Sequence, residues 1–274
     1  MRKLIIDCGF HTGVDSAYYI RKGFRVCGIE ANPSLNKVAK ENFEAEINEG
    51  KLILIEAAIV SENFDRDTVN FYVNDLNTEW GTISEDFLNR NRQSYGANST
   101  EIEVDTVKFS EIFSKYGVPY YIKIDVEGAD FDVLRSLGDV SELPKFLSLE
   151  SEQRDFEKLV HEIECLQQMG YSKFQAVQQR TIPGTKVLLR DVNGLEFEYK
   201  FPRSSSGGFG DDLPSECWKN YSEIIDEYKN IFREYKKWGP YSHVHKMIGR
   251  KPIALLQLIT GKPLPGWYDT HAKL

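Results

Sequence analysis

The first residues that could do chemistry follow an apolar run near the start of the chain, in IIDCGFHTG, residues 5–13. Asp7 ends the run, and Gly9 and Gly13 turn the chain after it. A dinucleotide pyrophosphate favours GxGxxG, whereas this turn has only GxxxG. The carboxylate of Asp7 would repel a pyrophosphate and would suit the cationic methionine end of S-adenosylmethionine. The turn therefore favours a methyl donor over a nicotinamide cofactor.

A second acid ends the next apolar run, FRVCGIE, at Glu30, which lies 30 − 7 = 23 positions after Asp7. A carboxylate at the end of the second strand can accept both hydroxyls of a ribose. His11 lies inside the first turn, and we assign it no chemical step. The predicted donor-binding residues are Asp7, Gly9, His11, Thr12, Gly13, Glu30, Ala31, Asn32 and Asp125.

A pair of acids stands in YIKIDVEGAD, residues 121–130, where Asp125 ends an apolar run and Glu127 follows. Methyl transfer to a neutral alcohol needs a base for the hydroxyl proton or a metal that polarises the oxygen, and either acid could serve. The alternative is that both acids only cap the next helix, with Lys123 as a partner charge. A divalent metal is compatible with these acids, but the sequence assigns no metal ligand.

Histidines are the remaining candidate bases. His161 lies on an amphipathic stretch, His243 and His245 stand in GPYSHVH, and His271 stands in WYDTHAKL near Asp269 on the same strand face. The predicted catalytic residues are Asp125, Glu127 and His271.

Alternating strand and helix signals must position these residues. The predicted strands are residues 3–7, 24–30, 52–60, 118–125, 145–150 and 171–178, with helices at 14–23, from Asn32 onward, at 128–138 and at 153–170. Residues 68–73 and 101–107 are expected as extra strands or strand ends around a polar loop. Repeated strand–helix–strand units predict a doubly wound α/β fold with a mostly parallel sheet.

Three segments together resemble one known family. They are IDCGFHTGVDS, GIEANPSL and YIKIDVEGADFDVL, and the combination is similar to the FkbM family of S-adenosylmethionine-dependent methyltransferases over residues 4–150. The resemblance implies that Asp7, Gly9 and Gly13 shape the donor pocket, that Glu30 holds the ribose, and that Asp125 and Glu127 face the reaction zone. The chain differs at Phe10 and His11, where the family usually has Ala and Asn. The implied reaction is O-methylation of a sugar, polyketide or other small-molecule hydroxyl.

The resemblance also implies a Rossmann-like methyltransferase sheet with a seventh strand, antiparallel and C-terminal. PGWYDTHAKL, residues 265–274, is the best remaining strand. Residues 179–262 then have no place in the sheet. We predict a single domain over residues 1–274, in which this mainly helical insertion, with a hairpin near 192–201 and a turn-rich stretch at 204–212, covers the substrate.

Composition limits the partners. The 274 residues carry a net charge of −8, which disfavours nucleic acid or an anionic membrane surface, and no apolar run reaches the ~18 residues of a membrane span. Four scattered cysteines predict no disulfide framework and no zinc site. We expect a cytoplasmic enzyme whose acceptor is a small molecule or a carbohydrate, and the sequence leaves its oligomeric state open.

Two other functions stay open at this stage. An NAD(P)-dependent oxidoreductase is disfavoured by the broken glycine pattern and by Asp7. A non-catalytic scaffold with a methyltransferase-like fold could use the aromatic stripe at residues 218–238 for docking, although the helical spacing of that stripe is more typical of core packing.

Overall fold

The computed structural model describes residues 3–239, 242, 247 and 266–274. The chain divides into two compact units. The first unit contains Met1–Leu149 and Leu188–Tyr199, and the second contains Glu150–Val187 and Lys200–Leu274.

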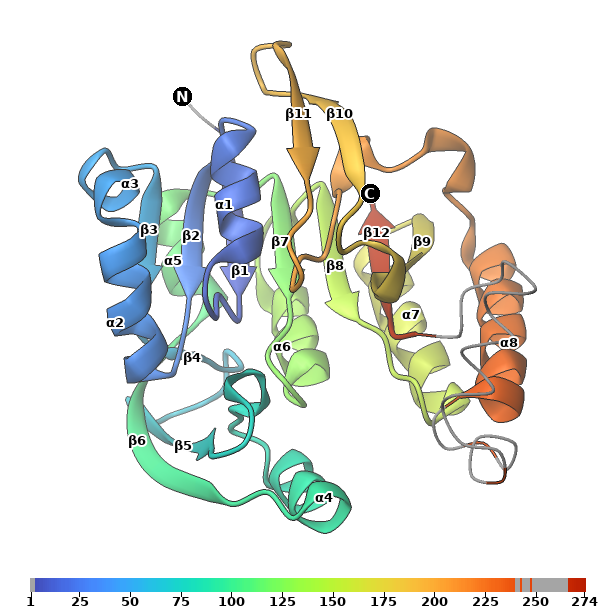
Figure 1. Ribbon diagram of the computed structural model, residues 1–274, viewed down its shortest axis with the longest axis horizontal. Helices are drawn as coiled ribbons and strands as arrows, with labels where there is room; N and C mark the ends of the chain where they lie inside the picture. Colours follow the sequence, from blue (N-terminus) through green and yellow to red (C-terminus); the bar gives the residue numbers. More distant parts are fainter. Residues whose placement is uncertain (1–2, 240–241, 243–246, 248–265) are drawn as a thin grey trace. The chain divides into compact units, whose positions relative to one another are not determined.

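The main sheet has seven strands in the order β3-β2-β1-β7-β8-β12-β9 (Figure 1). These are β1 (Leu4–Cys8), β2 (Arg25–Ile29), β3 (Leu52–Ile55), β7 (Tyr121–Ile124), β8 (Phe146–Glu150), β9 (Lys173–Gln178) and β12 (Tyr268–Lys273). Pairing is parallel from β3 through β8, and β12 runs antiparallel to β9. The predicted seven-stranded sheet with an antiparallel strand at the C-terminus is confirmed.

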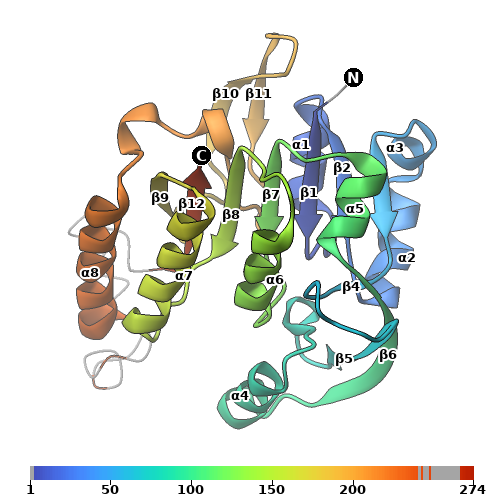
Figure 2. The same cartoon turned by 180° about the vertical axis from the view of Figure 1, so that it is seen from behind.

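Helices cover both faces of the first unit's sheet, as the two opposite views show (Figures 1 and 2). α1 and α2 lie on one face, and α5 and α6 lie on the other. The helices are α1 (Val14–Arg21), α2 (Pro33–Asn42), α3 (Glu44–Asn48), α5 (Phe109–Tyr116), α6 (Asp130–Ser136) and the 3-10 turn η2 (Leu137–Asp139). α2 begins as predicted, because Asn32 Oδ1 accepts the Ser34 amide at 3.0 Å and Pro33 occupies the first turn.

The predicted strand over residues 52–60 is wrong as one element, because the chain leaves the main sheet after β3. β4 (Ala58–Ile59) pairs instead with β6 (Ser99–Val107), which also pairs with β5 (Thr68–Asn74). Between β5 and β6 lie the 3-10 turn η1 (Thr78–Trp80) and helix α4 (Glu85–Tyr95). We call residues 58–107 the excursion. Figure 1 places it at the end of the sheet toward which β1 and β2 run.

A hairpin forms where residues 192–201 predicted one, from β10 (Lys186–Arg190) and β11 (Glu196–Lys200). Its residues 188–199 belong to the first unit. The Val192 amide donates to the Lys22 carbonyl at 2.9 Å, and the rings of Tyr18 and Tyr199 lie 4.8 Å apart. Because Lys22 follows the last turn of α1, the hairpin tip lies at the end of α1 opposite to its start at Gly13.

The second unit packs two helices with the C-terminal strand. They are α7 (Phe156–Met169) and α8 (Tyr221–Trp238), and short 3-10 turns lie at η3 (Gln179–Thr181), η4 (Gly210–Asp212) and η5 (Ser215–Cys217). Tyr228 of α8 is buried, and its hydroxyl lies 2.8 Å from Ser151 Oγ and 2.6 Å from Thr270 Oγ1. The aromatic stripe therefore packs inside this unit. Ser205 and Phe209 of the turn-rich stretch are buried as well.

All four cysteines are free thiols. Within the part of the chain that the structure describes, no helix is both long and apolar enough to cross a membrane.

Candidate active site

The turn after β1 is held against two other strand ends. Gly9 has φ +84°, and a Cβ there would lie 1.8 Å from the backbone oxygen of Asp125. The amides of Gly9 and Phe10 both donate to the Ile29 carbonyl, at 3.0 and 2.9 Å. Only glycine fits this position, because the backbones following β1 and β7 touch there. The ends of β1, β2 and β7 thus form one compact edge.

Phe10, where the chain differs from the usual family pattern, is a core residue and not a donor contact. Its side chain is 3% exposed and packs edge-to-face on Phe43 with 5.5 Å between ring centroids. A Cβ on Gly28 would lie 2.2 Å from the Phe10 ring, and a Cβ on Gly13 would lie 2.4 Å from it. Glycine at these two positions therefore makes room for Phe10.

Glu30 closes the turn with its carboxylate. Oε2 accepts the His11 amide and Oε1 accepts the Asn32 amide, both at 2.7 Å. Burial raises the pKa of Glu30, and hydrogen bonds from the amides of Asn32, His11 and Ala31 oppose that rise. An ionised carboxylate has about four lone-pair sites, so with three amides bound, acceptor capacity remains for one ribose hydroxyl. The residues predicted around Glu30 are thus brought together.

His11 occupies the left-handed region with φ 51°. This conformation costs a non-glycine residue about 1–2 kcal/mol, so contacts must hold it. Besides its amide bond to Glu30, its Nε2 lies 3.0 Å from Thr78 Oγ1 of the excursion. Burial lowers the imidazole pKa, which keeps the ring neutral near pH 7. Thr12 follows it, partly exposed, in the same turn.

Asp7 lies beneath this turn and is 1% exposed. Its Oδ2 accepts the Ser16 hydroxyl at 2.6 Å, and its Oδ1 has no hydrogen-bond partner among the described residues. Burial, partly offset by Lys123, raises the pKa of Asp7 to about 7. A buried carboxylate oxygen without a partner, next to a turn closed by Glu30, fits a ligand that brings a cation and a ribose. S-adenosylmethionine is such a ligand.

Lys123 neutralises the acids of this edge. It is 6% exposed, and its Nζ lies 2.8 Å from Asp125 Oδ2 and 3.2 Å from Asp15 Oδ2. Burial disfavours the cation, but Asp125, Asp15 and Asp7 outweigh it and raise the pKa of Lys123. The partner charge predicted for Lys123 is confirmed. Asp15 and Ser16 were missed, although they stand in the first turn of the helix that follows the glycine turn.

The second turn, residues 125–130, presents two carboxylates. Carboxylate oxygens of Asp125 and Glu127 lie within 4.8 Å of each other. The Asp125 side chain is 37% exposed, and Glu127 is partly exposed in the left-handed region with φ 49°. Neither side chain makes the hydrogen bond that the helix-capping alternative requires, because the N-cap of α6 is Ala129 and has no side-chain cap. Within the turn, Asp130 accepts the Val126 and Gly128 amides, at 3.0 and 3.1 Å. Burial, with the Asp125 charge second, raises the pKa of Asp130 to about 6.

The predicted histidines differ in their surroundings. His271 lies inside β12, 2% exposed, and burial lowers its pKa to about 3. The catalytic role predicted for His271 stays a prediction. His161 is exposed on α7. His243 and His245 lie outside the described residues.

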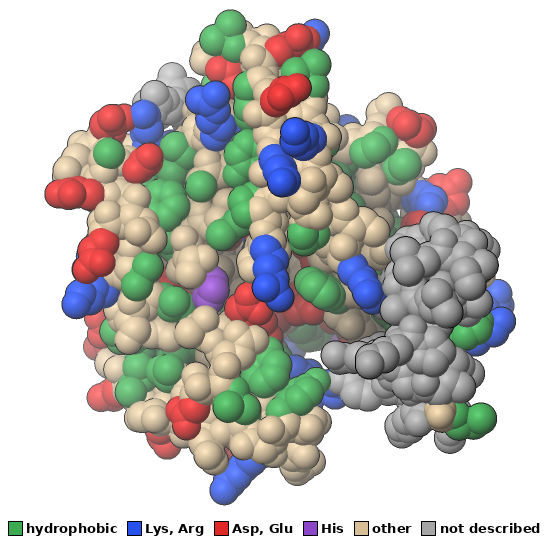
Figure 3. Space-filling model, in the orientation of Figure 1, with side chains coloured by type: hydrophobic (Ala, Val, Ile, Leu, Met, Phe, Trp, Pro, Cys, Tyr) green, Lys and Arg blue, Asp and Glu red, His purple; other side chains and the backbone are tan. Residues whose placement is uncertain are grey.

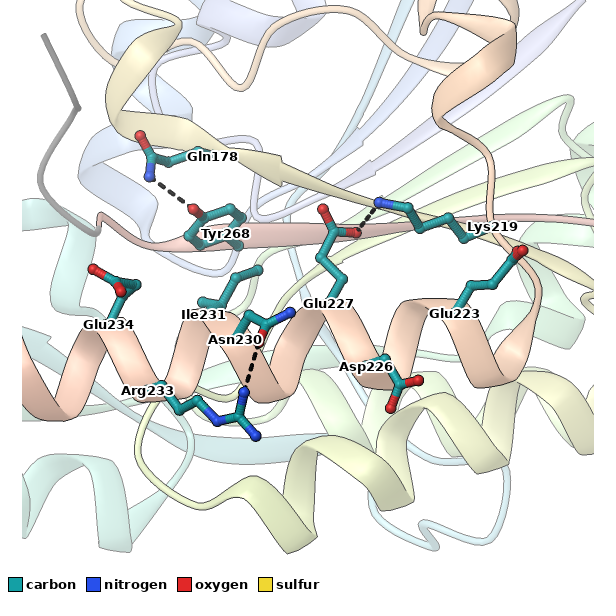
Figure 4. A pocket seen from close by; sticks show the side chains of 10 residues that line it. All are labelled: Gln178, Lys219, Glu223, Asp226, Glu227, Asn230, Ile231, Arg233, Glu234 and Tyr268. Carbon is teal, nitrogen blue, oxygen red and sulfur yellow. Dashed lines mark hydrogen bonds and ion pairs between the residues drawn. The ribbon is translucent and has the colours of Figure 1, made fainter.

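The second unit has a polar groove of about 960 Å³ between α8 and the strands β9 and β12 (Figure 4). Glu227 points toward Lys219, with Oε2 2.8 Å from Nζ, and Gln178 donates to the Tyr268 hydroxyl at 2.8 Å. The ten residues that line the groove include four acids and two cations, but none of the residues predicted for donor binding or catalysis.

The predicted insertion over residues 179–262 does not form one body. Residues 188–199 pack in the first unit at the far end of α1, and residues 200–239 belong to the second. Of the rest, residues 240–241, 243–246 and 248–262 lie outside the described part of the chain. Instead, the excursion contacts both candidate turns, through Thr78 to His11 and through Thr82 to Glu127.

The sheet, the glycine turn after β1 and the acid after β2 define a Rossmann-like fold of the methyltransferase class. The model of the methyltransferase FkbM domain matches residues 7–173, more than half of the chain. The chain therefore belongs to the FkbM family, and it is an S-adenosylmethionine-dependent methyltransferase.

Solved structures give distant likenesses. The chain is similar to precorrin-6y C5,15-methyltransferase from Geobacter metallireducens GS-15, with 11% identity over 73% of this chain and 76% of that one and a TM-score of 0.36. It is also similar to precorrin 8w decarboxylase from Methanobacterium thermoautotrophicum, with 13% identity over 73% and 78% of the chains and a TM-score of 0.33. A search of curated proteins gives no match.

Proposed function

We propose that the protein transfers a methyl group to a hydroxyl of a small molecule or a sugar, with Asp125 and Glu127 serving the acceptor. The observation that carries this proposal is the contact between the two turns. Gly9 touches the backbone of Asp125, so the donor turn and the two carboxylates share one edge of the first unit. Neither side chain makes a hydrogen bond that caps α6.

The donor, when bound, would supply an electrophilic methyl group on a sulfonium. Glu30 would bind a ribose hydroxyl, and Asp7 would favour the cationic end of the donor. Asp125 or Glu127 would take the acceptor's hydroxyl proton on a carboxylate oxygen as the oxygen–carbon bond forms and the bond from the methyl carbon to sulfur breaks, which would leave the donor as the thioether S-adenosylhomocysteine. The 2.8 Å ion pair with Lys123 holds the Asp125 carboxylate in place at the end of β7. His271 is proposed to serve the core of the second unit, because burial keeps it neutral.

We place the acceptor against the excursion. On the face shown in Figure 3, hydrophobic side chains gather where η1 and α4 lie. Leu76 is 65% exposed and Tyr95 is 50% exposed, and the rings of Trp80 and Tyr95 lie 4.8 Å apart. A pair of partly exposed aromatic rings suits the apolar face of a sugar or of another ring. The substrate-covering role of residues 179–262 stays a prediction.

Donor binding is tested with S-adenosylhomocysteine. It should raise the melting temperature of the protein, because a ligand of the folded state stabilises that state. Glu30→Ala should remove the shift, because it deletes both amide contacts and the ribose acceptor. Glu30→Gln, which can still accept but has lost the charge, should keep part of it. Binding of NADH in place of S-adenosylhomocysteine would overturn the assignment.

Turnover is tested with a panel of methyl glycosides and simple alcohols and phenols, measuring S-adenosylhomocysteine formation. Asp125→Asn should keep the melting temperature and lose most of the turnover with the best acceptor. Unchanged turnover would reduce Asp125 to a partner of Lys123. Loss of activity with a chelator and its recovery with magnesium would make the carboxylates metal ligands in place of bases.

A further inference from the structure

Two side chains keep Glu127 in an unusual backbone conformation. Among the described residues, His11 and Glu127 are the non-glycine residues with positive φ, and they lie in the two candidate turns. Such conformations persist only where the surroundings fix them. Glu127 is therefore held by contacts from neighbouring residues.

Thr82 makes the decisive contact. It is 1% exposed, and its hydroxyl donates to the Glu127 carbonyl at 2.7 Å while accepting the Ser84 amide at 2.9 Å. Its backbone is equally fixed, because its amide and carbonyl both pair with Tyr72 of β5, at 3.2 and 2.8 Å. A hydroxyl with both donor and acceptor roles occupied, on a backbone that a β-bridge ties to Tyr72, is a rigid anchor for the Glu127 turn.

Phe87 supports the same turn from below. It is 6% exposed, and a Cβ on Gly128 would lie 2.7 Å from its ring. Its position depends on the start of α4, because Ser84 Oγ accepts the Phe87 amide at 3.3 Å. Thr82, Ser84 and Phe87 thus form one connected contact to residues 127–128. This contact arises from a segment 45 positions away from Glu127 in the sequence.

We propose that Thr82 is a positioning residue for Glu127, whose hydroxyl holds the backbone of Glu127 in the left-handed conformation that presents its carboxylate beside Asp125. This rests on the function proposed above. Thr82 itself is buried and does not touch the acceptor. Through it, the excursion that lines the acceptor side also sets the geometry of the catalytic acids.

The experiment compares three variants. Thr82→Val keeps the shape but removes the hydroxyl, and Thr82→Ser keeps the hydroxyl. Thr106→Val is the matched control, because the Thr106 hydroxyl also donates to a backbone carbonyl of the excursion, Arg66 O at 2.9 Å, without contacting either turn. Amide hydrogen exchange of Val126 and Gly128 is measured without any acceptor, and kcat and KM are measured with the best acceptor of the panel.

Thr82→Val should raise the exchange of these two amides about tenfold and lower kcat about 10- to 100-fold, with little change in S-adenosylhomocysteine affinity. Thr82→Ser should restore both, and Thr106→Val should change neither. Wild-type exchange in Thr82→Val, or equal effects of Thr82→Val and Thr106→Val, would overturn the proposal.

A failure of the proposed function would give a different result. Faster exchange in Thr82→Val together with full turnover in Glu127→Gln would keep Thr82 as the anchor of the turn. It would remove Glu127 from the chemistry.

Discussion

Two segments of the first unit interrupt its alternating strands and helices, and they contact opposite ends of that unit. The excursion bonds to His11 and to Glu127, one residue in each candidate turn. The hairpin residues 188–199 bond to Lys22 and pack on Tyr18 of α1. Both contain an antiparallel strand pair, and both carry exposed apolar side chains such as Leu76 and Leu188. The composition of the two segments therefore does not show which of them serves the candidate site. The end of the sheet that each segment contacts distinguishes them, because only the excursion contacts the candidate turns.

The largest effect should come from Gly9→Ala, with Gly194→Ala in the hairpin turn as its partner. Both glycines have φ +84°, but a Cβ at Gly9 meets the Asp125 backbone at 1.8 Å and a Cβ at Gly194 meets nothing within 4 Å. Gly194→Ala should cost only the ~1–2 kcal/mol of the left-handed conformation. Gly9→Ala should cost well more than that and abolish S-adenosylhomocysteine binding.

Urea unfolding measures the loss of stability in each variant, and calorimetric titration measures S-adenosylhomocysteine binding. Equal losses of stability in the two variants would mean that the contact between the donor turn and Asp125 is not tight. The donor turn would then be no more tightly packed than the hairpin turn.

The sequence predicted the edge of the sheet well, because short-range rules determine it. An apolar run that ends in an acid, a glycine turn and a helix start predicted Asp7, Glu30 and Asp125 at neighbouring strand ends, and the structure places them there. The Asn32 cap followed from equally local chemistry.

The excursion was underestimated for a physical reason. Residues 52–60 form one apolar run, and nothing in it marks the point at which the chain changes sheets. Helix α4 has few apolar residues to give a helical period, although Ser84 caps its start and Gly96 ends it. The contact of Thr82 with Glu127 spans 45 residues and has no sequence signature. One feature of the sequence could have located the excursion. In a parallel α/β sheet, ligands bind at the carboxyl ends of the strands, and the excursion starts at the carboxyl end of β3.

The second prediction compares aromatic residues of the two segments. Phe87 is 6% exposed under Gly128, with the Arg90 guanidinium 4.1 Å from its ring centroid, whereas Phe197 is half-buried beside Arg21 and Tyr199. Phe87→Ala should cost about 3–5 kcal/mol and most of the turnover. Phe197→Ala should cost about 1 kcal/mol and leave kcat unchanged. A drop in kcat for Phe197→Ala at temperatures where it is folded would show that the hairpin also serves the site.

The third prediction uses pH. The pKa of Asp7 rises from 3.8 to about 7 on folding because the group is buried, so the folded state holds a proton that the unfolded chain releases between these values. Stability should fall by about 1.4 kcal/mol for each unit of rising pH in that window. Asp7→Asn should remove this slope, while Asp130, whose pKa is raised to about 6, still contributes one up to about pH 6.

Asp191 of the hairpin turn should change stability with pH in the opposite direction to Asp7. Amide hydrogen bonds, with that of Leu195 first, lower its pKa, so it adds stability at neutral pH that is lost as the pH falls. Urea midpoints from pH 4.5 to 8 should therefore become flatter in Asp7→Asn and hardly change in Asp191→Asn. An unaltered slope in Asp7→Asn would mean that Asp7 is ionised in the folded protein at all these values.

The smallest effect on stability should come from two equally exposed leucines, Leu76 of the excursion at 65% and Leu188 of the hairpin at 66%. Replacing either by Thr should change the free energy of unfolding by no more than about 0.5 kcal/mol, because each side chain buries little apolar area. The two should differ only toward the acceptor. If the excursion lines the acceptor site, Leu76→Thr raises KM for the best acceptor of the panel about two- to tenfold, the worth of a partial apolar contact, and Leu188→Thr leaves it unchanged. A higher KM for Leu188→Thr than for Leu76→Thr would place the acceptor at the hairpin in place of the excursion.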